Sequence, residues 1–344
     1  MKTHKNIIFL THAEKGPSGG AKIIYRHSEI IDKLKGYKSE VLHIKKTKIS
    51  KLKNSLQKKF KISNNFITGW QFNEIKPAKN FSYKWLNHKV NCKNNFNFQK
   101  KKDFIIIPEI FAHLALELSN EGKIGYAIFV QNGFVLDSTN NEKKLKKNYE
   151  SARFILSYSN AITKCLNLKF PKIKDKIVKI SYSLNLQKFN LNKKKNLITY
   201  MSRKLPSHSN LVINFLKSKI PKNWKIQDVN NLTEMETYKI LGQSRIFMSF
   251  SNFEGLPLPP AEAALAGNFV IGYTGEGGND YWYKPIFTKI NQGDICEFVR
   301  HILIKIRYKN QKNESKNKIF EILKKKFSKE LEIKNIQKFL KLTH

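Results

Sequence analysis

The sequence predicts an α/β fold in two halves, and three observations support this. Short apolar runs typical of buried strands alternate along the chain with stretches that carry apolar residues at helical spacing. This alternation occurs twice, and a charged stretch at residues 187–196 separates the two series. The chain has 344 residues, more than a single hydrophobic core usually supports. Together these features indicate two Rossmann-like halves that face each other across a cleft.

The first series opens with a strand–helix–strand unit. Gly19 and Gly20 stand at the turn from strand to helix, in a loop that starts at His12. Such glycines let a backbone approach an anion, but they also serve close packing of a helix on a strand, so both interpretations stay open. The unit is predicted at residues 6–11, 21–34 and 39–44.

Two later strands of this half end in polar residues. The strand at 103–108 is followed by Glu109, and the strand at 124–130 is followed by Gln131 and Asn132. The carboxyl ends of parallel strands share one edge of a sheet, where ligands bind. Strand-end capping and turn formation are the alternative. The other predicted elements are helices at 111–118, 142–152 and 161–168 and strands at 153–159 and 177–181.

The second series begins with a strand that ends next to two cations. Arg203 and Lys204 follow the strand at 197–201, and the chain has only six arginines among its 64 basic residues. An arginine in this position suggests a use for its bidentate guanidinium, although two solvated charges in a loop are the alternative. The other predicted elements are helices at 210–217 and 233–241, strands at 224–229 and 246–249, and a helical tail from residue 296.

Glycine and proline are concentrated in one stretch of this second half. Pro259 and Pro260 suit the last loop position and the first position of a helix, and Gly267 suits its left-handed carboxyl-terminal cap. Glu254 then lies in the preceding loop and Glu262 in the first helical turn. The start of this helix offers unpaired N–H groups and a positive dipole end, although an ordinary packing helix would have the same pattern.

These features would lie at one edge of the second sheet and suit a diphosphate. Arg203 and Lys204 supply charge, the helix start supplies N–H groups, and Glu262 could accept hydrogen bonds from ribose hydroxyls. No pair of aspartates is placed to carry a divalent metal. We therefore expect no metal or other cofactor, and we expect the cations to neutralise a leaving diphosphate directly.

The segment FEGLPLPPAEAALAG, in which Glu254 and Glu262 are eight positions apart, resembles the glutamate-pair signature of retaining GT-B glycosyltransferases of the family-4 type. The strand-end segment YMSRK is similar to the one that holds the diphosphate in that family, and GPSGG resembles its glycine loop. The resemblance covers most of the chain except residues 45–102.

The resemblance implies roles for individual residues. Glu254, Arg203 and Lys204 would be catalytic, with Glu254 on the hydroxyls of the donor sugar and the two cations on the diphosphate. The nucleotide-sugar donor would also be bound by Glu262, Gly19, Gly20, Gly255, Leu256 and Pro257. The acceptor side would be formed by Gln131, Asn132, Glu109 and His12.

The sequence departs from the family on the acceptor side. The family often carries a histidine where Gln131 and Asn132 stand, and amides can orient hydroxyl groups but cannot act as a general base. In a retaining front-face reaction the departing phosphate can take the acceptor's proton. His12 is another candidate base, with a solvated loop residue as the alternative.

The formal net charge of +38 raises the question of an anionic partner. Lysine is spread along the whole chain and arginine is scarce, which argues against dedicated nucleic-acid binding and fits weak contact with an anionic membrane surface. No window approaches the ~20 apolar residues of a membrane span. We expect a cytoplasmic protein that acts at the inner face of the membrane.

The sequence thus predicts a retaining, metal-independent glycosyltransferase with a saccharide or lipid-linked acceptor. A basic protein that binds nucleic acid or a membrane surface, and a related GT-B epimerase or phosphorylase, are the alternatives. The predicted domains are 1–190 on the acceptor side and 191–325 on the donor side, with a terminal helix at 326–344 that packs back on the first domain.

Overall fold

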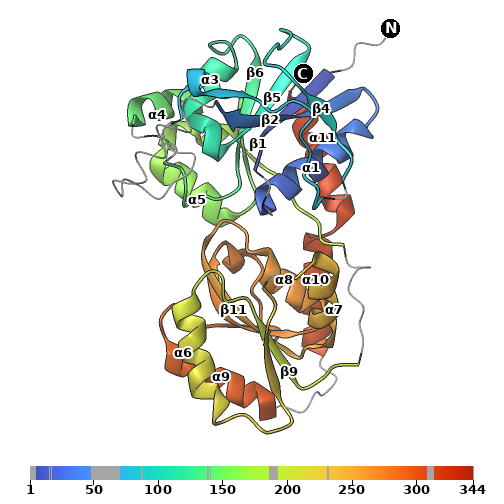
Figure 1. Ribbon diagram of the computed structural model, residues 1–344, viewed down its shortest axis with the longest axis vertical. Helices are drawn as coiled ribbons and strands as arrows, with labels where there is room; N and C mark the ends of the chain where they lie inside the picture. The colour runs from blue at the N-terminus through green and yellow to red at the C-terminus, as the bar shows by residue number, and fades with distance from the viewer. Residues whose placement is uncertain are drawn as a thin grey trace. The chain divides into compact units, whose positions relative to one another are not determined.

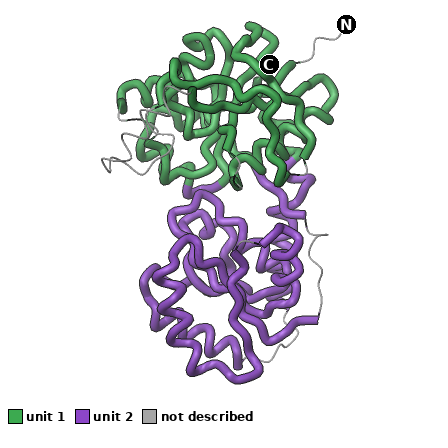
Figure 2. The backbone as a smooth tube through the Cα atoms, in the orientation of Figure 1, with its two compact units in different colours: residues 1–158, 162–180, 333–344 green, residues 159–161, 181–332 purple. Residues whose placement is uncertain are grey.

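The structure is a computed structural model, and the chain forms two compact units (Figure 2). It describes residues 5–14, 16, 18–47, 70–86, 88–137, 139, 141–185, 193–230, 232–307 and 314–343. Unit 1 contains residues 1–158, 162–180 and 333–344, and unit 2 contains residues 159–161 and 181–332. The expected domain limits at 190 and 325 stay predictions. The expected linker at 187–196 lies mostly outside the described residues.

Unit 1 is built on a largely parallel sheet in the order β3-β2-β1-β5-β6-β7-β8, with β4 beside β2. Only β3 runs antiparallel among the described strands. The chain passes from β1 to β2 on one side and reaches β5 on the other, so the order reverses between β1 and β5. The strands are β1 (Lys5–His12), β2 (Tyr37–Lys46), β3 (Ile75–Pro77), β4 (Asn91–Lys93), β5 (Asp103–Pro108), β6 (Gly125–Val130), β7 (Phe154–Ser157) and β8 (Ile177–Lys179).

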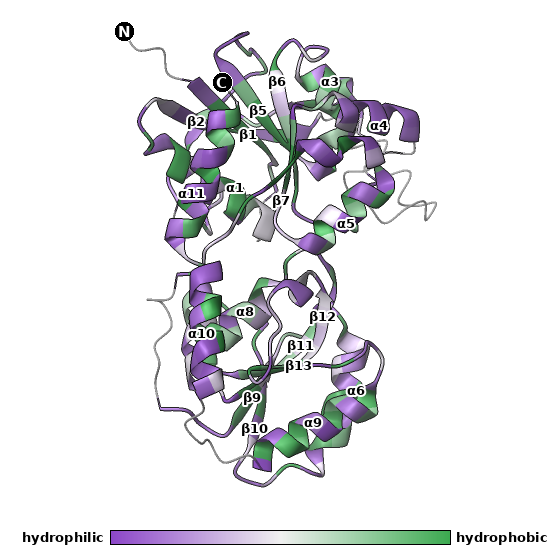
Figure 3. Ribbon diagram, turned by 180° about the vertical axis from the view of Figure 1, so that it is seen from behind, coloured by the Kyte–Doolittle hydropathy of each residue, from purple (hydrophilic) through white to green (hydrophobic). Residues whose placement is uncertain are grey.

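Helices cover both faces of this sheet, with α1 and α11 on one side and α4 and α5 on the other (Figures 1 and 3). From α11, the ring of Phe339 contacts the rings of Phe104 and Phe154, which belong to the sheet. The helices that contribute to this unit are α1 (Gly19–Asp32), α3 (Ala115–Leu118), α4 (Glu142–Ser151), α5 (Asn160–Lys169) and α11 (Lys329–Leu342), with 3-10 helices η1 (Phe72–Glu74), η2 (Glu109–Leu114) and η3 (Pro171–Lys176).

Unit 2 has a fully parallel sheet in the order β10-β9-β11-β12-β13. Here the order reverses between β9 and β11, which places a topological switch point at their carboxyl ends. Helices α6 and α9 cover one face, and α7, α8 and α10 cover the other (Figures 1 and 3). The strands are β9 (Leu197–Tyr200), β10 (Lys225–Asp228), β11 (Ile246–Glu254), β12 (Phe269–Glu276) and β13 (Phe287–Lys289). The helices are α6 (Pro206–Lys217), α7 (Glu234–Gln243), α8 (Leu258–Leu265), α9 (Ile295–Arg307), α10 (Glu314–Lys326) and the 3-10 helix η5 (Gly277–Asp280).

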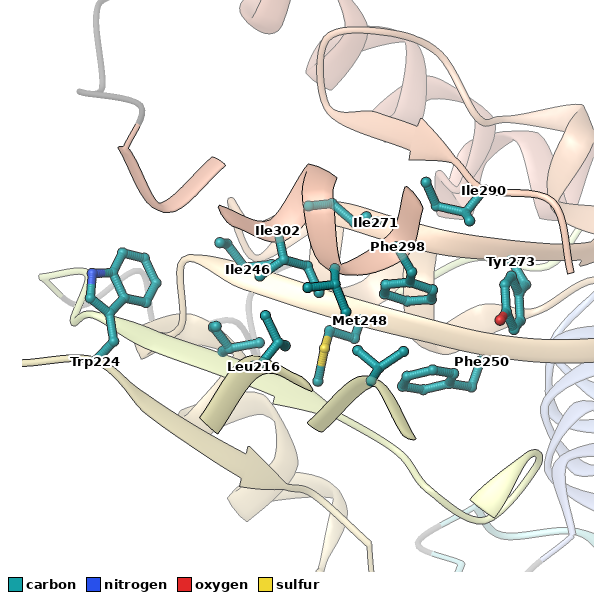
Figure 4. Packing of buried hydrophobic residues seen from close by; sticks show 13 residues of the cluster. Leu216, Trp224, Ile246, Met248, Phe250, Ile271, Tyr273, Ile290, Phe298 and Ile302 are labelled. Carbon is teal, nitrogen blue, oxygen red and sulfur yellow. The ribbon is translucent and has the colours of Figure 1, made fainter. Parts of the chain in front are cut away.

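The core of unit 2 lies between the sheet and the helices α6 and α9. The rings of Phe250 and Phe298 stack with centroids 5.0 Å apart, and Tyr273 meets Phe298 edge-on (Figure 4). Met248 of β11 lies in the same cluster and is fully buried. Because β11 is the central strand and both its faces are covered, its apolar run is continuous rather than alternating.

Candidate functional site

The carboxyl edge of the unit 2 sheet brings together the predicted catalytic residues. Lys204 follows β9 and Glu254 ends β11, and these two strands are neighbours at the switch point. The Nζ atom of Lys204 lies 3.3 Å from Oε1 of Glu254. The lysine side chain is 44% exposed, so the pair adds about 1 kcal/mol of stability at most. Its main effect is therefore to hold both groups beside the exposed Arg203.

Strand β11 is longer than the sequence predicted, and it is irregular near its end. The expected strand stopped at residue 249, but pairing with β12 resumes at Glu254, opposite Glu276, after a break in register. Within this break Phe253 has a φ of +47°, a left-handed conformation that is unfavourable for a bulky residue, and its side chain is 56% exposed. The irregularity places a strained aromatic residue directly before Glu254.

Helix α8 starts earlier than predicted, which changes the position of Glu262. Pro257 is the N-cap and Leu258 is the first helical residue, so Pro259 and Pro260 occupy the second and third positions. Prolines are tolerated there because the first N–H groups of a helix have no partner within the helix. Glu262 consequently lies in the second turn, not in the first. The predicted cap at Gly267 is confirmed by its φ of +85°.

A tyrosine that the sequence analysis missed holds Glu262. The hydroxyl of Tyr238 on α7 lies 3.2 Å from Oε1 of Glu262 and 3.0 Å from Oε1 of Glu234. Burial, together with the charge of both carboxylates, raises the pKa of Tyr238, so its hydroxyl keeps its proton. The only local signal was the spacing of four between Glu234 and Tyr238; the contact with Glu262 depends on the tertiary structure.

The glycine-dense loop packs against the backbone of the Glu254–Gly255 segment. A Cβ atom on Gly277 would lie 2.1 Å from the carbonyl oxygen of Gly255, so a side chain there would force the backbone to move. The buried Tyr281, four residues further on, donates its hydroxyl hydrogen to the carbonyl oxygen of Pro257. These contacts fix the path of residues 254–257, which includes the half-buried Leu256.

A small polar network lies beside Arg203 and was also missed. Ser202 donates to Oδ2 of Asp228 at 2.6 Å, and the side-chain amide of Asn230 donates to the Ser202 hydroxyl at 2.7 Å. Asp228 ends β10, so the network links the ends of β9 and β10. It restrains the turn that carries Arg203.

In unit 1, Glu109 is buried and binds backbone rather than facing solvent. It is 4% exposed, and its two carboxyl oxygens accept hydrogen bonds from the backbone N–H groups of Gln131, at 3.2 Å, and Asn132, at 3.0 Å. Burial raises the pKa of Glu109 to about 7, and the N–H donors only partly oppose this effect. The three residues that were predicted separately are thus one unit, in which Glu109 positions the loop.

Gln131 also contacts the predicted glycine turn. Its Nε2 atom donates to the carbonyl oxygen of Gly20 at 3.2 Å, and a Cβ on Gly20 would lie 2.1 Å from its Oε1 atom. The turn differs from the expectation because Gly19 and Gly20 are the first residues of α1, which is capped by the side chain of Ser18. A serine N-cap satisfies a free N–H and so extends the helix back to the glycines.

His12 is the last residue of β1 and not a loop residue, as one alternative had it. Its carbonyl oxygen accepts a hydrogen bond from the Tyr83 hydroxyl, which holds the strand end in place. Burial lowers the pKa of the His12 imidazole, while the nearby Glu14 raises it. The net direction is downward, which favours a neutral ring that can accept a proton.

Within the part of the chain that the structure describes, no three His, Cys, Asp or Glu side chains gather in a way that could hold a metal ion. Over the same residues, no helix combines the length and apolar character needed to cross a bilayer.

Comparison with known proteins gives no match by sequence and clear matches by structure. No protein-family model and no curated protein matches the chain. The apo form of the lipopolysaccharide outer core galactosyltransferase WaaB superposes with a TM-score of 0.65 over 98% of this chain and 100% of its own, at 14% identity. HepE from Anabaena, in complex with UDP and glucose, has a TM-score of 0.64 over 99% of both chains, at 10% identity.

The fold is that of GT-B glycosyltransferases. The predicted α/β class with two Rossmann-like domains is thereby confirmed. At these identities the likeness shows the fold alone. The N-terminal domain of Candida albicans trehalose-6-phosphate phosphatase also matches this GT-B chain, with a TM-score of 0.64 over 99% of this chain and 96% of its own, at 8% identity. The reaction must therefore be argued from the site.

Proposed function

We propose that the protein is a glycosyltransferase that moves a sugar from a nucleotide-diphosphate sugar to a saccharide or lipid-linked acceptor. The observation that carries this proposal is the ion pair between Lys204 and Glu254 at the switch point of unit 2, beside the exposed Arg203. The carboxyl edge of an open parallel sheet at its switch point is where nucleotides bind in such folds. The UDP and glucose bound by HepE, a structure of the same fold, support the class of donor.

In this proposal each residue at the edge has a distinct task. Arg203 and Lys204 bind the diphosphate and stabilise the charge that develops on it as the bond to the sugar breaks. Glu262, held by Tyr238, accepts hydrogen bonds from the ribose hydroxyls. Glu254 orients the hydroxyls of the sugar, and the backbone of Gly255, Leu256 and Pro257 contacts the donor.

The residues of unit 1 would serve the acceptor. Gln131 and Asn132 orient its hydroxyl groups, and Glu109 holds their backbone in position. His12 is the candidate base, and Gly19 and Gly20 would contact the donor phosphates. We further propose that the reaction retains the anomeric configuration and needs no metal, so that the departing phosphate takes the acceptor's proton. Action at the cytoplasmic face of a membrane belongs to the same proposal.

The proposal is tested in two steps. A thermal-shift screen of UDP, GDP, ADP and their sugars identifies the donor, and turnover is then measured in EDTA. We expect Arg203→Ala and Glu262→Ala each to lose about 100-fold or more in kcat/KM, because each removes a charged contact to the donor. The product should keep the anomeric configuration of the donor sugar.

Arg300→Ala is the matched control, because Arg300 is an exposed arginine of the same unit that is paired with Glu297 on α9. It should keep wild-type turnover. Wild-type turnover in both the Arg203 and the Glu262 variant would show that the site is misassigned. If no nucleotide sugar shifted the melting temperature, the proposed function itself would be wrong.

A further inference from the structure

A second cationic pocket lies at the opposite edge of the unit 2 sheet. It is a small cavity of about 20 Å³ at the amino-terminal ends of β11 and β12, and its lining includes Lys194, Arg245, Lys305 and Phe269. Arg245 immediately precedes β11 and Phe269 is the first residue of β12. Because the strands are parallel, this edge is remote from the carboxyl edge that carries Arg203 and Glu254.

Two lysines from different helices approach the same ring of this pocket. Nζ of Lys305, on α9, lies 3.8 Å from the ring centroid of Phe269, and Nζ of Lys316, on α10, lies 4.5 Å from it. Lys194 adds a third ammonium group, which donates to the carbonyl oxygens of Ala266 and Leu241. An ammonium has three N–H donors, so Lys194 can cap both helix ends and still offer one hydrogen to a ligand.

The three ammonium groups are half-buried and repel one another. Burial lowers the pKa of Lys194 to about 7, and the charge of Lys316 lowers it further. The pKa of Lys305 is also lowered, first by burial and then by Lys316, and burial lowers the pKa of Lys316 itself. Like charges that are brought together in partly desolvated positions gain most from a bound anion.

Arg245 provides an independent observation. Its Nε atom is buried, and it has no hydrogen-bond partner among the described residues. The guanidinium carbon lies 6.0 Å from the ring centroid of Trp224, which borders the same pocket. A buried guanidinium N–H that lacks an acceptor is costly, and an oxyanion would supply the acceptor.

We propose that this pocket, formed by Lys194, Arg245, Lys305 and Lys316, binds a phosphate-sized oxyanion. The small volume admits a single compact group, and the four cations come from separate segments that converge on the rings of Phe269 and Trp224. The phosphate is either a free ion or the headgroup of an anionic lipid, since both present the same oxygens. The site is separate from the proposed donor edge and does not depend on the reaction proposed there.

The test compares two double variants that remove the same charge. Lys305→Gln/Lys316→Gln alters the pocket, and Lys318→Gln/Lys325→Gln removes two exposed lysines of α10. Melting temperatures and calorimetric titrations are measured with inorganic phosphate against chloride at constant ionic strength. We expect phosphate to raise the melting temperature of the wild type and the control, and to bind the pocket variant at least tenfold more weakly.

An equal response to phosphate in the pocket variant and the control would overturn the proposal. Arg203→Ala, which alters the other edge, should respond like the wild type; if it lost the response instead, phosphate would be binding the donor edge and the pocket proposal would be wrong. Should the double variant fail to fold, Arg245→Gln takes its place with the same expected loss.

Vesicles identify the source of the phosphate once the pocket variant has lost its response to the free ion. Cosedimentation is measured with phosphatidylglycerol and with phosphatidylcholine vesicles. Weaker binding of the pocket variant than of the control to phosphatidylglycerol vesicles alone supports a lipid headgroup at the site. Equal vesicle binding by the two variants supports a free phosphate ion there.

Discussion

Single side chains at both sheet edges are held by contacts that leave them little freedom. Glu109 shows this best, because a carboxyl group with an ordinary pKa of 4.5 is buried and titrates at about 7. Its two backbone hydrogen bonds favour the charged form, but the loss of hydration outweighs them. The group therefore couples the folding of unit 1 to pH.

Glu109 should make the protein less stable as pH rises. Below pH 4.5 the carboxyl is protonated in both the folded and the unfolded chain; between pH 4.5 and 7 only the folded chain keeps the proton, so stability falls through this window and then levels off. The shift corresponds to about 3 kcal/mol.

The measurement is the free energy of unfolding of wild type and Glu109→Gln at several pH values, and the quantity of interest is the difference between them. Taking the difference cancels other groups, such as His43 and His113, whose lowered pKa values act in the opposite direction. A difference that stays constant from pH 4.5 to 7.5 would show that Glu109 has an ordinary pKa in the folded protein.

At the scale of elements, the donor edge depends on how two loops meet. The turn after β11 and the 3-10 helix η5 are in direct backbone contact at Gly255 and Gly277. Neither segment could take its observed path with a side chain at Gly277, so the glycine there serves the packing of one loop on another.

Gly277→Ala should therefore destabilise unit 2. The added methyl would lie 2.1 Å from the Gly255 carbonyl oxygen, and the backbone must shift to relieve the clash, at a cost of about 1–3 kcal/mol. Chemical denaturation measures the loss. Gly19→Ala is the control, because its Cβ would meet nothing within 4 Å, and it should change stability by less than about 1 kcal/mol. Equal stability of the two variants would contradict the packing argument.

At the scale of the whole molecule, the net charge of +38 is the dominant property. It comes mostly from lysine, which attracts polyanions without the bidentate geometry that reads bases. We therefore expect binding to nucleic acid to be unspecific and governed by counterion release.

Fluorescence anisotropy with random duplexes at increasing salt tests this expectation. The logarithm of the association constant should fall linearly with the logarithm of the salt concentration, and affinity should not depend on sequence. Sequence-selective binding that persists at high salt would instead favour a dedicated nucleic-acid-binding function. The pocket around Phe269 is excluded as the main cause if its double variant shows the same slope as its charge-matched control.

The sequence determined the fold class and the positions of most elements, because apolar periodicity and glycine or proline punctuation are local signals. The run DFIIIP gave β5 with the same limits that the structure has, and Gly267 gave the end of α8. The departures occur where one segment meets another. β11 continues to Glu254 because it pairs with β12, and α1 begins at Gly19 because Ser18 caps it.

The tertiary structure alone decided which predicted residues act together. Lys204 and Glu254 are fifty residues apart, and only the strand order of the sheet places them 3.3 Å from each other. The hold of Glu109 on the backbone of the 131–132 loop, and of Tyr238 on Glu262, likewise depends on neighbours distant in sequence. Composition and spacing determine which groups a chain has and which element carries each, whereas burial and strand order determine what each group meets.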